Sequence, residues 1–229
     1  MLEQDVAIGD YFEFGDENFG IKKDTRESMI KLMERLCDIK AYKEDTLYLS
    51  ISLADRYLLY LAKANKPAPV LVSLGAITVF IAAKLNETPC PSLDLIIDII
   101  RFKQKKPDWK QKLIDLEEKI IKALQFNLML PTQMGFLDRY LRIFGMDKQV
   151  REQKYARTIR DATQYLCRYM IRDSSFLIYK PCQMAAVSLL AAMNAQSALF
   201  RHQARQQRIT RKRKSKSKRQ LAADKRANK

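Results

Sequence analysis

Four charged side chains lie within segments that are otherwise apolar: Arg26, Asp55, Lys84 and Glu117. Lys84, for example, closes the apolar run Gly75–Ala83. A charge removed from water is costly unless it meets a group of opposite sign. Two cations and two carboxylates can form ion pairs, either with one another or with another protein. The chemistry that these residues offer is therefore charge recognition.

Taken alone, two of these charges also have simple structural explanations. Lys84 can be a lysine at a helix end, with its stem buried and its ammonium in water. Glu117 can be a helix-surface carboxylate paired with a lysine such as Lys110 or Lys119, as its neighbour Glu118 is expected to be exposed. The residues themselves do not decide between these explanations and binding to a partner.

Catalytic and metal-binding patterns are missing from the sequence. It has no glycine-rich phosphate loop and no histidine placed for acid–base catalysis. The single histidine, His202, is remote from the cysteines, and no two cysteines form a Cys-x-x-Cys pair. We therefore expect no enzymatic activity, no metal and no cofactor. The cysteines are expected to be buried, reduced thiols: Cys37, Cys90, Cys167 and Cys182.

The composition favours an all-α fold. Of 229 residues 47% are apolar, enough to bury a core, and only 6 are glycine and 7 proline. A large antiparallel sheet would need more turn residues than that. The longest apolar run, Val70–Ala83, is too short to cross a bilayer, and the acidic N-terminus does not look like a signal peptide. We expect a soluble protein with no membrane partner.

The positive charge is concentrated in one segment. The formal net charge is +16, and residues 201–229 supply +12 of it through 13 Lys/Arg and one acid, Asp224. The rest of the chain carries only +4. This distribution argues against nucleic-acid binding by the folded part and leaves it only to the tail.

Helical spacing of apolar residues, interrupted by prolines, predicts the elements that must position the four charges. The predicted helices cover residues 25–39, 45–64, 70–86, a segment starting at Ser92, and then 109–126, 132–144, 149–171 and 181–200. The third is apolar nearly all round and is expected at the centre, with Gly75 allowing a neighbour to approach closely. Residues 1–24 are interpreted as a mobile or loosely docked leader.

Seven stretches occur in an order and at distances that match one protein family. They are Arg26-Glu-Ser-Met-Ile, Tyr42-Lys-Glu-Asp-Thr-Leu, Leu53-Ala-Asp-Arg-Tyr-Leu, Ala82-Ala-Lys-Leu-Asn-Glu, Leu116-Glu-Glu-Lys-Ile, Leu124-Gln-Phe-Asn-Leu-Met-Leu-Pro-Thr and Phe136-Leu-Asp-Arg-Tyr-Leu. The ordered set resembles the cyclins, most closely the A/B-type cell-cycle members, over roughly residues 25–145.

The resemblance implies a fold and a role for each of the four charges. It implies a five-helix cyclin box over residues 25–130 and a partial second box over residues 131–200, followed by a basic, disordered tail. Arg26 and Asp55 match the family's structural ion pair between the first two helices. Lys84 and Glu117 match the residues that contact the kinase.

Two departures from the family pattern affect these implications. In the family's substrate-docking patch Leu32 replaces a tryptophan, so Met29 and Leu32 mark a patch whose use is open. The second box shows three predicted helices where the family has five. Either the protein is a reduced cyclin, or the last two helices are absent from this chain.

The implied function is that of a regulatory subunit that binds and activates a cyclin-dependent protein kinase in cell-cycle control. The alternatives are a cyclin-fold nucleic-acid or transcription adaptor, and a scaffold that holds a kinase without activating it. The tail resembles a nuclear import signal, which predicts an import receptor as a partner and a nuclear, and also cytoplasmic, location. The signal residues are Arg211, Lys212, Arg213, Lys214, Lys216, Lys218 and Arg219.

Overall fold

The computed structural model describes residues 7–14, 19–100, 109–145, 154–199, 201–202 and 205–206. Every regular element within these ranges is helical, which confirms the all-α prediction. The elements are α1 (Lys23–Lys40), α2 (Glu44–Lys63), α3 (Leu71–Asn86), α4 (Leu93–Ile100), α5 (Trp109–Ala123), α6 (Gln133–Ile143), α7 (Lys154–Arg172), the short 3-10 helix η2 (Ser174–Ile178), and a helix over residues 181–199.

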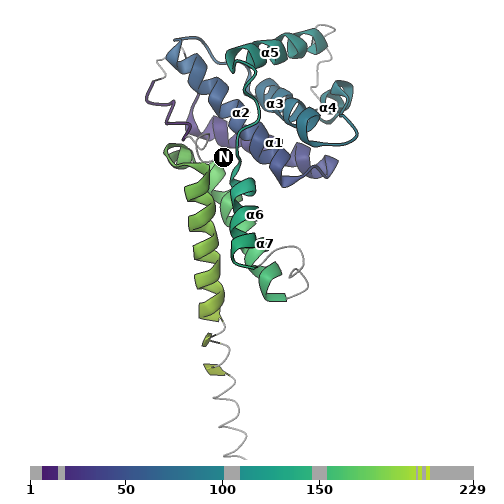
Figure 1. The fold of residues 1–229 in the computed structure, drawn as a ribbon. Coiled ribbons are helices and arrows are strands. Elements are labelled where there is room, and N and C mark those ends of the chain that lie inside the picture. The colour runs from purple at the N-terminus through teal and green to yellow at the C-terminus, as the bar shows by residue number, and fades with distance from the viewer. Residues whose placement is uncertain are drawn as a thin grey trace, which may run out of the picture.

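Helices α1 to α5 form one body, which we call the first body (Figure 1). α3 packs against α1, α2, α4 and α5 and lies at its centre, as predicted. All ten residues from Leu74 to Ala83 are buried, so α3 has almost no polar face. A helix that is apolar on all sides is stable only when other elements enclose it. The first body is therefore organised around α3.

Gly75 explains how closely α1 approaches α3. A Cβ atom added at Gly75 would lie 3.0 Å from the Cγ atom of Met29 and 3.1 Å from that of Met33. These separations are shorter than ordinary van der Waals contact, so a larger residue would force the Met29 and Met33 side chains to shift. The predicted close approach at Gly75 is confirmed.

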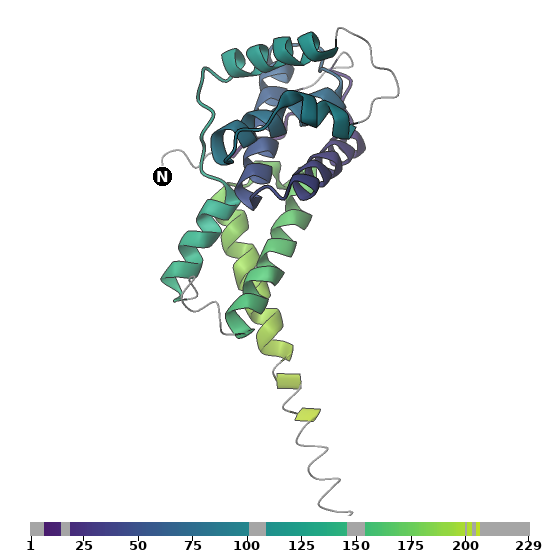
Figure 2. The ribbon, with the colours of Figure 1, turned by 90° about the vertical axis from the view of Figure 1, so that its right-hand side faces the viewer.

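The remaining elements form a narrower second body: α6, α7, η2 and the helix over residues 181–199 (Figures 1 and 2). Thr132 caps α6 by accepting a hydrogen bond from the Gly135 amide at 3.2 Å. The same hydroxyl donates to the Asp45 carboxylate at the start of α2, at 3.0 Å. Thr132 thus begins the second body and holds it against the first.

The leader is bound far more firmly than the sequence suggested. Tyr11 is completely buried and Phe19 is 5% exposed, and both belong to the main core. The Gly9 amide also donates to the Leu177 carbonyl in η2, at 3.0 Å. Our expectation of loose docking is wrong for the described residues 7–14 and 19–22. These aromatic side chains supply apolar area that the helices alone do not.

Two further sequence expectations were tested by the structure. Cys37 and Cys167 are buried free thiols, but Cys90 is exposed and Cys182 is partly exposed, so the expectation of four buried thiols is wrong for two of them. Cys90 stands in a proline-rich turn between α3 and α4, where little covers it. In the described part of the chain, no helix combines the length and the hydropathy needed to cross a membrane.

Candidate functional site

Arg26 and Asp55 form a buried ion pair between α1 and α2. Arg26 Nε lies 2.8 Å from Asp55 Oδ1 and Nη2 lies 2.7 Å from Oδ2, a bidentate arrangement. The side chains are 2% and 1% exposed. The Tyr11 hydroxyl donates to the same carboxylate at 2.9 Å, so the leader completes the site. Burial alone lowers the pKa of Arg26, but Asp55 and Tyr11 outweigh it, and the net shift is upward.

The same guanidinium also joins the two bodies. Arg26 Nη1 donates to the main-chain carbonyls of Ile171 and Arg172, each at 3.1 Å. These carbonyls belong to the last turn of α7, where helix carbonyls lack partners within the helix. One arginine therefore links α1, α2 and α7. We call this arrangement of Arg26, Asp55, Tyr11 and the α7 carbonyls the junction.

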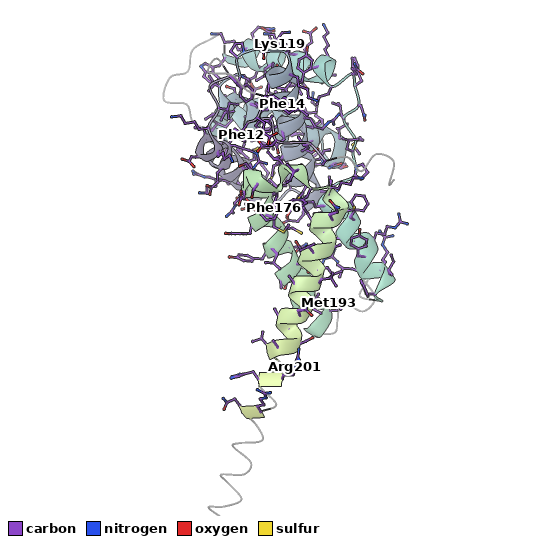
Figure 3. All side chains as sticks on the ribbon, turned by 90° about the vertical axis from the view of Figure 1, so that its left-hand side faces the viewer. Phe12, Phe14, Lys119, Phe176, Met193 and Arg201 are labelled. Atoms are coloured by element: carbon purple, nitrogen blue, oxygen red, sulfur yellow. The ribbon has the colours of Figure 1, made fainter. Side chains whose placement is uncertain are left out.

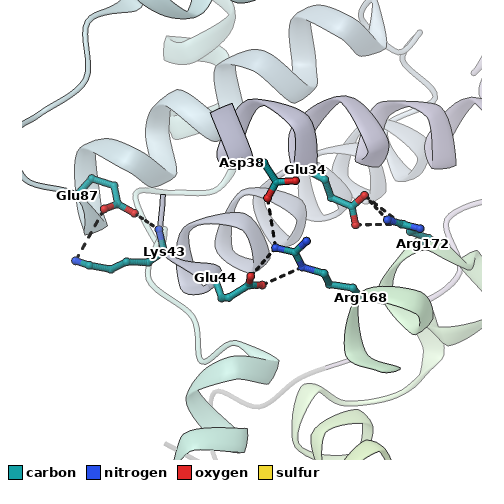
Figure 4. A network of polar contacts seen from close by, with 7 residues as sticks. All are labelled: Glu34, Asp38, Lys43, Glu44, Glu87, Arg168 and Arg172. Carbon is teal, nitrogen blue, oxygen red and sulfur yellow. Dashed lines mark hydrogen bonds and ion pairs between the residues drawn. The ribbon is translucent and has the colours of Figure 1, made fainter. Parts of the chain in front are cut away.

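Further ion pairs link α7 to α1 and α2 (Figure 4). Arg172 on α7 binds Glu34 on α1, with Nη2 and Oε2 2.6 Å apart, and Glu34 is 7% exposed. One turn earlier, Arg168 binds Glu44 on α2, with Nε and Oε2 3.2 Å apart. Arg168 also lies 3.5 Å from the Asp38 carboxylate. Because these contacts use α1, α2 and α7 together, they fix the angle between the two bodies.

Lys84 and Glu117 meet on a different face, between α3 and α5. The Lys84 ammonium forms an ion pair with Glu117 Oε1, a buried oxygen. The side chains are 37% and 14% exposed. The ammonium also lies 4.4 Å from the centre of the Phe80 ring, a cation–π contact. The pair is therefore partly open to solvent and to another protein.

The local pairings that compete for Glu117 do not form. Lys110 binds Asp94, with Nζ and Oδ1 2.9 Å apart. Glu118, on the outer side of α5, binds Lys122. Glu117 points instead toward α3. That a kinase contacts Lys84 and Glu117 stays a prediction.

Exposed apolar side chains occur on the same two helices and just after α5. Leu85 is 42% exposed next to Lys84, and Ile114 is 40% exposed one turn before Glu117 on α5. Phe126, just after α5, is 74% exposed. We call these side chains together with Lys84 and Glu117 the α3–α5 surface. A mostly apolar surface with a charged pair is typical of a protein-binding site.

Sequence reasoning assigned no role to Phe126, although it lies in one of the matching stretches. Both Gln125 and Phe126 adopt positive φ angles, 52° and 59°. Such angles are uncommon for residues other than glycine, and a large apolar residue held exposed in this way is unusual. The sequence predicted a helix that continues through residue 126, whereas α5 ends at Ala123 and Phe126 lies beyond it.

Met29 and Leu32 differ in their accessibility. Met29 is 2% exposed, packed beneath Gly75, and Leu32 is half-buried against the core. Of the two residues, only Leu32 presents a surface to a peptide in this conformation. The basic residues 211–219 lie outside the described residues. Among the residues described, no group of three or more His, Cys, Asp or Glu side chains is arranged to hold a metal ion.

Family models match both bodies. The model "Cyclin, N-terminal domain" matches residues 3–129, and "Cyclin, C-terminal domain" matches residues 131–216. The N-terminal match includes the leader, in agreement with the burial of Tyr11.

Individual relatives are more distant. The chain is 25% identical over 181 residues to the G2/mitotic-specific cyclin-B3 of Mus musculus, covering 79% of this chain and 12% of the relative. It is 26% identical over 176 residues to Cyclin-B2-2 of Arabidopsis thaliana, covering 77% of this chain and 37% of the relative. The chain thus spans less than half the length of these relatives.

A solved structure shares the fold. The viral cyclin from herpesvirus saimiri superposes with a TM-score of 0.67 at 18% sequence identity, covering 85% of this chain and 80% of that chain. At this identity the likeness shows the fold alone. Together with the two family matches and the ordered motifs, these observations show that the chain belongs to the cyclin family.

Proposed function

We propose that this chain is a regulatory subunit that binds a cyclin-dependent protein kinase through the α3–α5 surface and activates it allosterically. The observation that carries the proposal is the Lys84–Glu117 pair, an ammonium and a carboxylate side by side among exposed apolar side chains. The B-type cyclins among the relatives support a role in cell-cycle control. The chain itself has no catalytic role in this proposal.

Phosphoryl transfer by a protein kinase requires two elements to be in place: an ion pair between the catalytic lysine and the αC-helix glutamate, and an aspartate that holds Mg²⁺. A rigid surface that binds only the assembled arrangement raises its population. The rigidity is supplied here by α3, whose residues 74–83 are all buried among the neighbouring helices. Binding at the α3–α5 surface thereby raises the fraction of kinase molecules in the active arrangement.

The mutual pairing of Lys84 and Glu117 suits such a surface. In the free protein each charge has a partner, so neither is left unpaired at a partly dry site. Because Lys84 is 37% exposed, its ammonium can turn toward an incoming carboxylate at modest cost. Glu117 Oε1, released from the Lys84 ammonium, can then accept a hydrogen bond from the kinase.

The test is a double substitution, Lys84→Ala with Glu117→Ala, in the full chain. We expect loss of association with a purified cyclin-dependent kinase, measured by size-exclusion chromatography, and loss of the rise in phosphate transfer to a protein substrate. Far-ultraviolet circular dichroism should be unchanged. The matched control is Glu118→Ala with Lys122→Ala, which removes the neighbouring exposed pair on α5 and should leave binding intact.

Unchanged kinase binding by the Lys84/Glu117 double variant contradicts the assigned surface. If the unmodified chain binds the kinase but phosphate transfer does not rise, the chain is a scaffold and activation is wrong.

We further propose that residues 211–219 direct the protein to the nucleus through an import receptor. The support is the basic composition of the segment alone. Replacement of its seven Lys/Arg by Gln in a fluorescent fusion should move the protein from nucleus to cytoplasm. Unchanged nuclear fluorescence contradicts this proposal.

A further inference from the structure

A pocket of about 230 Å³ lies where the two bodies meet, remote in sequence from Lys84 and Glu117. α2 forms one wall, the segment leading into α6 a second, and the end of α7 with η2 a third. Figure 3 shows Phe176 of η2 at this boundary. The lining is mostly apolar, with Leu59, Leu130, Phe176 and Met184 among its residues. An apolar pocket of this kind with a few polar groups is typical of small-molecule sites.

Unsatisfied polar atoms are concentrated at this pocket. Three buried side-chain polar atoms in the described residues have neither a hydrogen-bond nor an ion-pair partner, and all three belong to lining residues: Tyr48 Oη, Arg56 Nη1 and Gln133 Oε1. Tyr48 is 2% exposed and Gln133 is 4% exposed. Leaving such groups unpaired costs roughly 1–3 kcal/mol each. Their presence in one place points to a ligand that supplies the missing partners.

Arg56 determines the charge of that ligand. Its Nη2 donates to the Asn127 carbonyl at 2.8 Å, and no described carboxylate forms a salt bridge with it. Burial lowers the pKa of Arg56 from its ordinary value. The two acids that line the pocket are already engaged, Asp55 by Arg26 and Asp173 by Ser175. Arg56 therefore has no carboxylate in the pocket to neutralise it, and this favours a negatively charged ligand.

The shape of the pocket follows from α2 and the segment beside it. Tyr48 and Arg56 are eight residues apart on α2, a rise of about 12 Å. The segment Asn127–Thr132 runs in the opposite direction, because Asn127 binds Arg56 and Thr132 binds Asp45. The pocket is thus elongated, with Arg56 toward one end and Tyr48 toward the other. A cavity of about 150 Å³ holds benzene, so by volume this one encloses roughly nine non-hydrogen atoms, and because it opens to solvent a slightly longer ligand can protrude from it.

We propose that the pocket binds a small elongated organic acid, with its carboxylate on Arg56, an apolar middle, and a hydroxyl at the end near Tyr48 and Gln133. Such a molecule contacts α2 of the first body together with α7 and η2 of the second. It therefore stabilises the arrangement of the two bodies. The site does not depend on kinase binding.

The probe is para-hydroxyphenylpropionate, titrated into the full chain by isothermal titration calorimetry. Its amide, which has the same shape without the charge, should bind at least tenfold more weakly, because a charge-assisted hydrogen bond is lost. Phenylpropionate, which lacks the hydroxyl, should bind several-fold more weakly than the probe. No detectable binding of the acid at millimolar concentration, or equal binding of acid and amide, overturns the proposal.

Substitutions locate the site. Arg56→Met should weaken binding of the acid at least tenfold and leave binding of the amide unchanged. The matched variant is Arg35→Met, at an exposed arginine of α1 that does not line the pocket, and it should bind the acid as the unmodified chain does. Tyr48→Phe should abolish the preference for the hydroxylated acid over phenylpropionate. Undiminished acid binding by Arg56→Met places the ligand elsewhere and overturns the assignment. If Arg56→Met does not fold, the acid–amide comparison on the unmodified chain decides.

Discussion

The junction and the α3–α5 surface each contain a cation and a carboxylate held between two helices, yet their surroundings are opposite. At the junction the paired side chains are 2% and 1% exposed, and every guanidinium nitrogen of Arg26 donates to an acceptor. At the α3–α5 surface the exposures are 37% and 14%, and the ammonium also lies over the Phe80 ring. A dry, fully hydrogen-bonded pair holds a fold together, whereas a partly exposed pair remains available to a partner.

The substitution expected to separate the two regions most strongly is Asp55→Ala. It leaves the buried Arg26 cation without its carboxylate, which should lower the free energy of unfolding by roughly 3–5 kcal/mol. Urea denaturation followed by circular dichroism measures the loss. Asp94→Ala, which removes the acid of an exposed pair, is the control and should cost less than about 1 kcal/mol. A loss below 1 kcal/mol for Asp55→Ala contradicts the structural role of the junction.

A smaller effect is expected when only the leader's share of the junction is removed. Tyr11→Phe keeps the ring packing and deletes the hydroxyl that donates to Asp55, at 2.9 Å. The expected loss in unfolding free energy is roughly 1–2 kcal/mol, because Arg26 still neutralises the carboxylate. Tyr165→Phe, at a 71% exposed tyrosine, is the control. Equal stability of the Tyr11→Phe variant and the unmodified protein argues that the leader's hydroxyl contributes nothing.

At the α3–α5 surface the expectation is reversed. Lys84→Ala with Glu117→Ala should change the unfolding free energy by less than about 1 kcal/mol, because a partly exposed pair contributes little to stability. Kinase binding should nevertheless be lost. If urea denaturation shows instead that the double variant loses several kcal/mol of unfolding free energy, the pair is structural. The contrast with the junction then disappears.

The smallest expected effect is a pH dependence of stability that comes from Asp173, just after α7. Asp173 accepts hydrogen bonds from the Ser175 amide and hydroxyl, and these lower its pKa below the ordinary value of 3.8. A carboxyl whose pKa falls on folding stabilises the fold above its unfolded pKa, and this contribution is lost as pH falls through the folded pKa. The melting temperature of Asp173→Asn should therefore be lower than that of the unmodified protein at pH 7. The difference should vanish in acid below the usual aspartate range; a constant difference excludes the carboxylate as its cause.

The first body was largely predictable because its signals are local. Apolar spacing and the prolines gave α2 and α3 within one residue at each end, and the all-round apolarity of α3 predicted its central position. Thr132 after Pro131 correctly indicated the start of α6. Each inference rested on residues within a few positions of one another.

The junction was only half predictable. The Arg26 and Asp55 roles came from a resemblance, but nothing in the sequence connected Arg26 with the α7 carbonyls, which lie 145 and 146 residues away. A main-chain acceptor has no residue-type signal. Tyr11 was missed for a related reason: glycines and acids around it suggested a loose segment, while the buried carboxylate that fixes it is 44 residues distant.

The dual role of Arg26 limits how the protein can be divided for study. An expression fragment ending near residue 130 retains Asp55 but removes the two carbonyls that Arg26 Nη1 requires, and it also uncovers Glu34. One beginning at residue 25 discards Tyr11 and Phe19 from the core. We expect both fragments to be less stable than the full chain, so weak kinase binding by either one need not mean that the kinase-contact residues were assigned wrongly.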